Sequence, residues 1–278
     1  MSILEFSLLV WLGSFIAGLV GALTGLGGGV VIVPLLTSVF GVDIRYAVGA
    51  SLVSVIATSL GSASTYIKKG YVNLRLAMFL EVATTIGALI GALVATHISV
   101  KILSIILAII LIYSAYLSQR PKLEHREIAA PDPLAECLQL NGTYPTAQGL
   151  ISYQVHALPG GFSIMLIAGI ISGLLGIGSG AFKVLAMDQA MGLPFKVSTT
   201  TSNFMIGVTA AASAGVYLTQ GYIDPGLSMP VMLGVLPGAF LGAKILIGAQ
   251  TQILRIIFSL VLVIMALKMV YNNLVGVL

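Results

Sequence analysis

Two short stretches rich in glycine decide how this chain is organised: AGLVGALTGLGGG at residues 17–29 and AGIISGLLGIGSG at residues 168–180. The second follows the first by 151 positions, and the glycines of the two stretches fall in one register. Each stretch lies within a long apolar segment. Self-similarity at a fixed spacing indicates a repeated structural unit, so the two stretches predict an internal duplication.

The same register extends outward from the glycines without a gap. Apolar sequence of low complexity gives some matches by chance, but it does not readily align glycines, tyrosines and a basic residue together. We therefore expect two tandem homologous copies of one unit. The matching pairs, copy one first, include Gly41 and Gly192, Arg45 and Lys196, Ser51 and Ser202, Thr58 and Thr209, Tyr66 and Tyr217, and Tyr71 and Tyr222.

The composition is that of a membrane protein. The chain is 58% hydrophobic and 8% charged, with a mean hydropathy of +1.08, whereas soluble domains carry about 25% charged residues. Backbone in lipid must be helical or form a closed barrel, and long apolar stretches of about 20 residues favour helices. The sequence predicts an all-α polytopic membrane protein with eight to ten membrane helices. The apolar stretches are residues 3–23, 47–67, 76–95, 102–117, 163–175, 231–247 and 253–270.

Several functional classes are excluded by what the sequence lacks. The single cysteine, Cys137, cannot form an internal disulfide or a cysteine-based metal cluster. The three histidines, His97, His125 and His156, are scattered. We find no basic patch interleaved with aromatic residues, as nucleic-acid binding would need, and no nucleophile–base pair. We expect no enzyme activity, no cofactor, no metal and no nucleic-acid partner.

A polar segment divides the chain into three parts. Residues 1–118 form the first membrane repeat, residues 119–161 a linker and residues 162–278 the second repeat. The second half of the linker alternates polar and apolar residues around a segment of turn residues, which is typical of two short strands. A small β-hairpin outside the membrane and a disordered linker are the two alternatives.

The two copies face either opposite sides of the membrane or the same side. The segments 26–40 and 177–191, which follow the glycines, are short for a membrane span. If they cross or half-cross, each copy has five passes and the copies are inverted; if they are re-entrant or extend the preceding helix, each copy has four passes and the copies are parallel. Five passes gather most lysines and arginines on one side, as cytoplasmic loops require. This favours inverted copies with a cytoplasmic linker in the cell (inner or plasma) membrane.

The two glycine clusters are the first candidate binding residues. Glycine weakens a helix and frees backbone groups from their partners, and irregular backbone at membrane depth survives where it lines a cavity or is buried in protein. Paired breaks at matching places in two halves point to a transporter binding site, where a half-helix can present N–H groups to an anion. The alternative is close helix packing, which we assign to Gly87, Gly91, Gly238 and Gly242. The candidate binding residues are Gly25, Gly27, Gly28, Gly29, Gly176, Gly178, Ser179 and Gly180.

Three charged residues within apolar segments are further candidates. Lys183 follows the second cluster by three residues, and its copy-one counterpart is Ile32. A lysine at a membrane helix centre costs about 2.5–3.5 kcal/mol, so it needs a partner or a function: Asp188 is a candidate partner, an anionic substrate is another, and snorkelling to the interface is the alternative. Glu81 and Asp188 are candidate proton-coupling residues.

Hydroxyl and amide side chains early in each copy complete the candidate site. Ser51, Ser202 and Asn203 are expected to donate hydrogen bonds to the oxygens of an anion, together with Thr58 and Thr209. The alternative is hydrogen bonding between helices or to the preceding turn. The tyrosines at the ends of helices are expected to be interface anchors. They are Tyr66, Tyr71, Tyr217 and Tyr222.

The sequence resembles the TauE/SafE family of sulfite and sulfonate exporters. The resemblance rests on GLGGG at residues 25–29 followed by VVIVP ending at Pro34, on GIGSGAFK at residues 176–183, and on the polar central segment. It implies a secondary carrier of sulfite, organosulfonates or related small anions. Two departures affect the symmetry of the halves: Ser179 replaces a glycine of the second cluster, and Leu185 stands where copy one has Pro34.

The expected mechanism is alternating access at a midplane site between the two repeats, with protons as a candidate coupling ion. A passive anion channel and a membrane sensor that signals through the linker are the alternatives. Neither the identity of the anion, the direction of transport, nor the choice between monomer and homodimer follows from the sequence.

Overall fold

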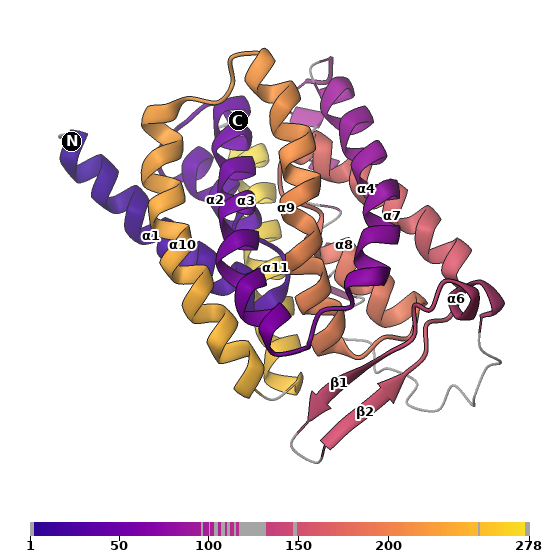
Figure 1. Cartoon of the computed structure of the whole chain (residues 1–278). Coiled ribbons are helices and arrows are strands. Elements are labelled where there is room, and N and C mark those ends of the chain that lie inside the picture. Colours follow the sequence, from indigo (N-terminus) through magenta and orange to yellow (C-terminus); the bar gives the residue numbers. More distant parts are fainter. Residues whose placement is uncertain are drawn as a thin grey trace.

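The computed structural model is mostly helical (Figure 1). It describes residues 3–95, 97–99, 101–102, 105–106, 109, 112–113, 115–116, 132–146, 149–249 and 251–275. Within these residues, five helices are long and apolar enough to cross a membrane, which confirms the prediction of a helical, multi-pass membrane protein. The five segments are Glu5–Thr24, Ile44–Lys68, Leu74–Ala95, Leu158–Leu175 and Pro225–Gly248.

The first four helices of copy one recur in the same order in copy two. Copy one has α1 (Ile3–Thr24), α2 (Gly29–Ser38), α3 (Ile44–Lys68) and α4 (Leu74–Ala95). Copy two has α7 (Leu158–Leu175), α8 (Gly180–Leu185) followed by the π-helical turn η1 (Ala186–Ala190), then α9 (Phe195–Thr219), α10 (Pro225–Gly248) and α11 (Thr251–Val275). The ten residues of α2 rise about 15 Å, which is half the thickness of a hydrocarbon core.

The helix boundaries repeat because the residues that set them repeat. Asn73 accepts a hydrogen bond from the Leu76 N–H at the start of α4, and Asp224 accepts one from the Leu227 N–H at the start of α10. Such side chains satisfy N–H groups that lack a partner within the helix. Gly70 and Gly221 lie just past α3 and α9 in the left-handed region, which glycine adopts at helix C-termini.

The two copies are interlocked. Helix α1 packs along α10 of the other copy, and α7 packs along α4; Figure 1 shows these two pairs on opposite sides of the bundle, with α3 and α9 between them. Because the shift of 151 residues carries α1 to α7 and α4 to α10, each contact occurs twice. Reciprocal contacts of this kind are those of a pair related by a two-fold axis.

Glycines set the close approach at both interlocked contacts. A Cβ atom at Gly87 would meet the carbonyl oxygen of Leu166, and one at Gly238 would meet that of Phe15. The prediction that these glycines serve helix packing is confirmed, and the contacts are equivalent in the two copies. Small side chains here allow the backbones of adjacent membrane helices to touch.

A short hairpin joins the copies. Strand β1 (Gly142–Thr146) pairs antiparallel with β2 (Gly149–Tyr153), within the segment where alternation favoured strands. Helix α6 (Pro133–Cys137) precedes it. The Asp132 carboxylate accepts hydrogen bonds from the Leu158 and Leu134 N–H groups, and the first of these lowers its pKa most. The start of α6 is thereby tied to the start of α7, while the linker residues 119–131 lie outside the described part.

Candidate functional site

Each glycine cluster ends one helix and begins another. Helix α1 ends at Thr24 and α2 begins at Gly29, while α7 ends at Leu175 and α8 begins at Gly180. Four glycines of these two breaks have φ angles between +65° and +77°, a region that L-residues with a Cβ atom rarely adopt. They are Gly25, Gly27, Gly176 and Gly178.

The second break contains one residue that departs from this rule. Ser179 has φ +51° although it carries a side chain, whereas its counterpart Gly28 has φ −61°. A left-handed conformation at a residue other than glycine costs about 1–2 kcal/mol. The departure noted in the sequence therefore coincides with a real difference in backbone conformation between the two breaks.

The two breaks lie against each other. A Cβ atom at Gly180 would meet the Gly25 carbonyl oxygen, and a Cβ atom at Gly29 would lie 3.2 Å from the Gly176 carbonyl oxygen. Gly29 and Gly180 are equivalent positions, as are Gly25 and Gly176. The contact is thus reciprocal, and the backbone of each half-helix touches the break of the other copy.

Two serines close this contact with matching hydrogen bonds. Ser51 Oγ donates to the Gly176 carbonyl at 2.7 Å, and Ser202 Oγ donates to the Gly25 carbonyl at 2.9 Å. Both serines are fully buried and occupy equivalent positions in α3 and α9. A carbonyl that has left the helical hydrogen-bond pattern is costly in an apolar environment unless it is paired. The serines supply that pairing across the copies.

Two tyrosines bond to the turns that precede the breaks. Tyr66 Oη donates to the Ala22 carbonyl at 2.9 Å, and Tyr217 Oη donates to the equivalent Gly173 carbonyl at 3.3 Å. Tyr66 is 0% exposed and Tyr217 5%. The expectation that these two residues are interface anchors is wrong, because the helix breaks provide buried acceptors for their hydroxyl groups. Asn203 Nδ2 also donates to the Ala22 carbonyl at 2.8 Å.

Polar atoms without a partner are concentrated near the breaks. Ser54 and Ser179 are fully buried, and neither hydroxyl has a hydrogen-bond partner among the residues that the structure describes. The same holds for Thr199 Oγ1 and for Asn203 Oδ1. Buried polar atoms normally have partners, so unpaired ones at a function-bearing junction call for a ligand or water. These atoms give the junction spare capacity for hydrogen bonds.

Lys183 is held beside the second break by Glu81. Lys183 Nζ lies 3.3 Å from Glu81 Oε2, and the lysine is fully buried. Thr209 joins the pair, because its hydroxyl accepts a hydrogen bond from Lys183 Nζ and donates one to Glu81 Oε1. Thr85 Oγ1 also donates to Glu81 Oε1, at 3.3 Å. We call these four residues, from α4, α8 and α9, the charged cluster.

The ion-pair partner of Lys183 is Glu81 and not Asp188. Asp188 was a candidate because it follows Lys183 by five residues, but the ion pair is made with Glu81, 102 residues away. The π-helical turn carries Asp188 along η1, where its Oδ2 accepts a hydrogen bond from Gln189 Nε2. The alternative that Lys183 snorkels to the membrane interface is also wrong, because its side chain is fully buried beside Glu81. Thr85 and Thr84 were missed, although they follow Glu81 by one helical turn.

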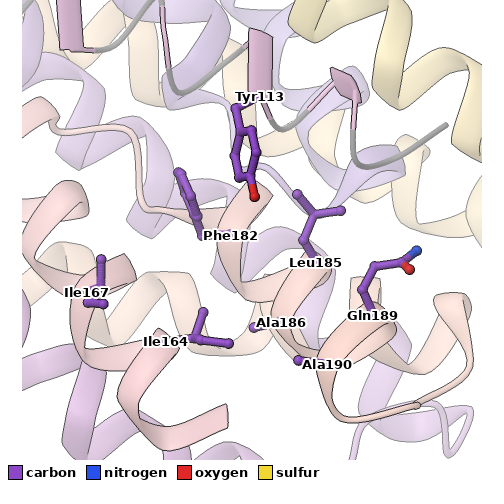
Figure 2. Close-up of a pocket in the computed structure, with 8 residues that line it drawn as sticks. All are labelled: Tyr113, Ile164, Ile167, Phe182, Leu185, Ala186, Gln189 and Ala190. Atoms are coloured by element: carbon purple, nitrogen blue, oxygen red, sulfur yellow. The ribbon is translucent and has the colours of Figure 1, made fainter. Parts of the chain in front are cut away.

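A separate apolar cavity of about 300 Å³ lies beside α7, α8 and η1. Figure 2 shows Tyr113, Phe182 and Leu185 around this space. The remaining lining residues are Ile164, Ile167, Ala186, Gln189 and Ala190. Neither member of the ion pair lines it, although Phe182 precedes Lys183 in α8.

Of the predicted site residues, the structure therefore brings together all the cluster glycines, Ser51, Ser202 and Asn203. Lys183 and Glu81 lie next to them, because the Lys183 N–H bonds the Ser179 carbonyl. Asp188 lies farther along η1.

Comparison with known proteins agrees with this architecture. A probable membrane transporter protein of Bacillus subtilis, YunE, is 31% identical over 278 residues, spanning 97% of this chain and 99% of its own. A second from the same organism, YdhB, is 26% identical, spanning 85% of this chain and 89% of its own. A third, from Methanocaldococcus jannaschii, is 27% identical over 92% of both chains. No solved structure matches the chain significantly.

The family described as sulfite exporter TauE/SafE matches residues 10–269, which is nearly the whole chain. Both glycine breaks, both serines and the charged cluster lie inside this match. The resemblance drawn from the sequence is confirmed, and the chain belongs to the TauE/SafE family of membrane transporters.

Proposed function

We propose that this protein carries a small anion, sulfite or an organosulfonate, across the cell membrane by alternating access. The observation that carries the proposal is the reciprocal contact of the two glycine breaks at the junction of the copies. The family description names sulfite, and Lys183 supplies a positive charge beside the junction. The site would comprise the break backbone, Ser51, Ser202 and Lys183.

The closed contact supports a carrier better than a pore. Gly25, Gly29, Gly176 and Gly180 are buried and touch each other's backbone, so a solute reaches the junction only when the two breaks move apart. Separation would free the Gly25 and Gly176 carbonyls and the two serine hydroxyls at once. A hydroxyl released from a carbonyl can donate to an anion instead. The bound anion would therefore replace the contacts that opening removes.

The repeat symmetry supports the alternating motion. Two interlocked copies of one unit have two equivalent ways to open, one on each side of the junction, if they are inverted in the membrane. The proposal therefore takes the copies as inverted, with the linker in the cytoplasm. The distribution of lysines and arginines favours this orientation. Rocking of the α1–α10 pair against the α4–α7 pair would expose the junction to each side in turn.

Uptake into proteoliposomes tests the proposal. Purified protein is reconstituted and offered sulfite, methanesulfonate, sulfoacetate, sulfate and acetate in separate assays. We expect saturable uptake of sulfite or a sulfonate, inhibited by the same anion unlabelled, and little uptake of acetate. Flux that rises linearly with concentration would instead support a channel. Absence of flux for every anion would overturn the proposal.

Ser51→Ala combined with Ser202→Ala is the matched test of the site. We expect a higher half-saturation concentration for the transported anion, because two donors are lost. Ser163→Ala is the control, since the Ser163 hydroxyl is exposed near the start of α7 and bonds only to its own helix. An unchanged half-saturation concentration in the double variant would remove the serines from the site.

A further inference from the structure

The charged cluster is present in only one of two equivalent places. The shift of 151 residues relates Lys183 to Ile32, Glu81 to Met232 and Thr209 to Thr58. Ile32 is fully buried, and Met232 packs against the same apolar cluster. Thr58 accepts a hydrogen bond from the Gly28 N–H and donates one to the Ser54 carbonyl. The same arrangement of helices is therefore built once around an ion pair and once around apolar side chains.

This contrast argues against a structural need for the ion pair. Removing two charges from water costs several kcal/mol per ion, and well-packed apolar residues in place of a buried pair are often neutral or stabilising. The apolar corner shows that this fold accommodates such residues. Ionisable groups retained inside a membrane protein mark ion pathways and proton relays. The pair is therefore better explained by function than by stability.

We infer that Glu81 is an internal anion that holds Lys183 while the site is empty and gives way to the transported anion by taking up one proton. The inference rests on the proposed function and specifies its coupling. When the anion pairs with Lys183, the displaced Glu81 carboxylate accepts a proton from the open side. When the anion leaves on the other side, the proton leaves there and the ion pair forms again. One proton accompanies each monovalent anion.

Charge balance explains why the two events are linked. The empty cluster contains one ammonium and one carboxylate, and the loaded cluster contains the ammonium, the anion and a neutral carboxyl group. The net charge is zero in both states. Binding without protonation would leave one negative charge in excess, and protonation without binding would leave one positive charge, each costly away from water.

The geometry assigns the proton to Glu81. Its side chain is 10% exposed, whereas that of Lys183 is 0% exposed, so the carboxylate is the less buried end of the pair. Thr209 contacts both members and can keep its hydrogen bond to whichever anion faces the lysine. Thr85 donates to the carboxylate from within α4, so the acid keeps a partner.

The other ionisable groups on the packed elements have contacts of their own. Helix α7 carries none. On α9, Lys196 donates to the Ile247 carbonyl and Tyr217 to the Gly173 carbonyl. Arg75 on α4 donates to Gln139, and Asp188 on η1 accepts from Gln189. The group that faces Glu81 is thus Lys183.

The test uses proteoliposomes with an imposed pH gradient and two probes, methanesulfonate and sulfite. Methanesulfonate stays ionised through the tested range, so it cannot bring the proton itself. With the outside one pH unit more acidic, we expect the wild type to accumulate methanesulfonate about tenfold, since one unit corresponds to a factor of ten in an equilibrium. Glu81→Gln should lose accumulation but retain exchange of internal for external anion, because glutamine resembles the protonated acid.

Infrared difference spectroscopy on the reconstituted protein supplies a second readout. Addition of sulfite or methanesulfonate should produce the C=O stretch of a protonated carboxyl group in the wild type, and Glu81→Gln should lack it. This measurement needs no variant to establish the protonation. Glu136→Gln, an exposed acid of α6, is the matched control and should retain both the band and the accumulation.

The outcomes separate the two proposals. Uptake without gradient-driven accumulation or without the carboxyl band would overturn the coupling and leave the carrier in place. Accumulation by Glu81→Gln equal to that of the wild type would do the same. Failure of the wild type to transport or bind either probe would overturn the proposed function and this inference with it.

Discussion

The segments that follow the two glycine breaks occupy equivalent places but differ in chemistry. Helix α2 is apolar, regular and contains Pro34, whereas α8 and η1 contain Lys183, Asp188 and a π-helical turn. The interlocked helices and the serine bonds around them are paired by symmetry. The surroundings of Ile32 and Met232 thus represent the scaffold, and those of Lys183 and Glu81 represent the scaffold with charges added. A π-helical turn within a helix often accompanies a functional site, which fits this division.

The largest expected effect comes from making copy two resemble copy one at a single position. Lys183→Ile would leave the Glu81 carboxylate buried without its partner, and breaking a buried pair in this way costs about 3–5 kcal/mol. Adding Glu81→Met reproduces the apolar combination of Ile32 and Met232 and should recover most of that stability. Thermal unfolding in detergent measures both variants.

Transport assays on the same two variants distinguish a role of the ion pair in stability from a role in function. Neither Lys183→Ile nor the double variant should carry anions, because the positive charge is gone. Recovery of folding without recovery of uptake would show that the pair serves transport. A double variant as unstable as the single one would show instead that folding needs the ion pair of Lys183 and Glu81.

The next effect compares Gly29 and Gly180, the equivalent glycines at which α2 and α8 begin. Gly180→Ala would push its Cβ against the Gly25 carbonyl, which is backbone, whereas Gly29→Ala would meet Ser51 Oγ at 2.6 Å and Val55 Cγ2 at 2.7 Å, which are side-chain atoms. Overpacking costs about 1–3 kcal/mol. We expect Gly180→Ala near the upper end and Gly29→Ala near the lower end, because side chains move more easily than backbone.

Unfolding temperatures of the two variants test this ranking. Gly215→Ala is the control, since a Cβ at this position of α9 has no atom within 4 Å and alanine favours a helix. It should be neutral or slightly stabilising. Equal losses in unfolding temperature for Gly29→Ala and Gly180→Ala would mean that the backbone of the break moves as easily as the side chains do.

A smaller effect tests the symmetry of the serine bonds. Ser51→Ala and Ser202→Ala each remove one hydrogen bond to a break carbonyl, worth about 1 kcal/mol. Because the two bonds are equivalent, we expect equal losses in the free energy of unfolding. Denaturant unfolding of each variant measures them. A loss at Ser202 alone would show that the first break, whose Gly25 carbonyl Ser202 bonds, depends more on this contact than the second break depends on Ser51.

The sequence was sufficient for features that are local or periodic. The apolar stretches predicted the long helices, the glycines predicted the breaks, and the register of 151 residues placed Ser51 and Ser202 at equivalent positions. Each of these depends on a residue's own conformational preference or on its place in the repeat. Such signals do not need knowledge of which helices are neighbours.

The features that were mistaken depend on which helices pack against each other. The partner of Lys183 lies on α4 because α4 packs against helices of copy two, and no spacing within α8 could indicate it. Tyr66 looked like an anchor because it lies near a helix end, yet it is buried against the turn before the first break. Long-range pairing of this kind follows from packing of whole helices.

The smallest expected effect concerns Ser179, where the two breaks differ in backbone conformation. Ser179→Gly restores the residue that copy one has, removes the strain of a left-handed serine and removes a buried hydroxyl without a partner. Against this, glycine loses more conformational entropy on folding. The net gain in stability should be about 0.5–1 kcal/mol.

The same substitution should weaken binding of the transported anion. If the strained serine is kept because its hydroxyl meets the anion at the open junction, Ser179→Gly gains stability and raises the half-saturation concentration, a trade-off expected where a strained residue serves function. Ser179→Ala distinguishes the two causes, because it removes the hydroxyl and keeps the strain. It should weaken anion binding as much as Ser179→Gly without the full gain in stability. Unchanged uptake by both variants would show that Ser179 has a strained backbone but no role in anion binding.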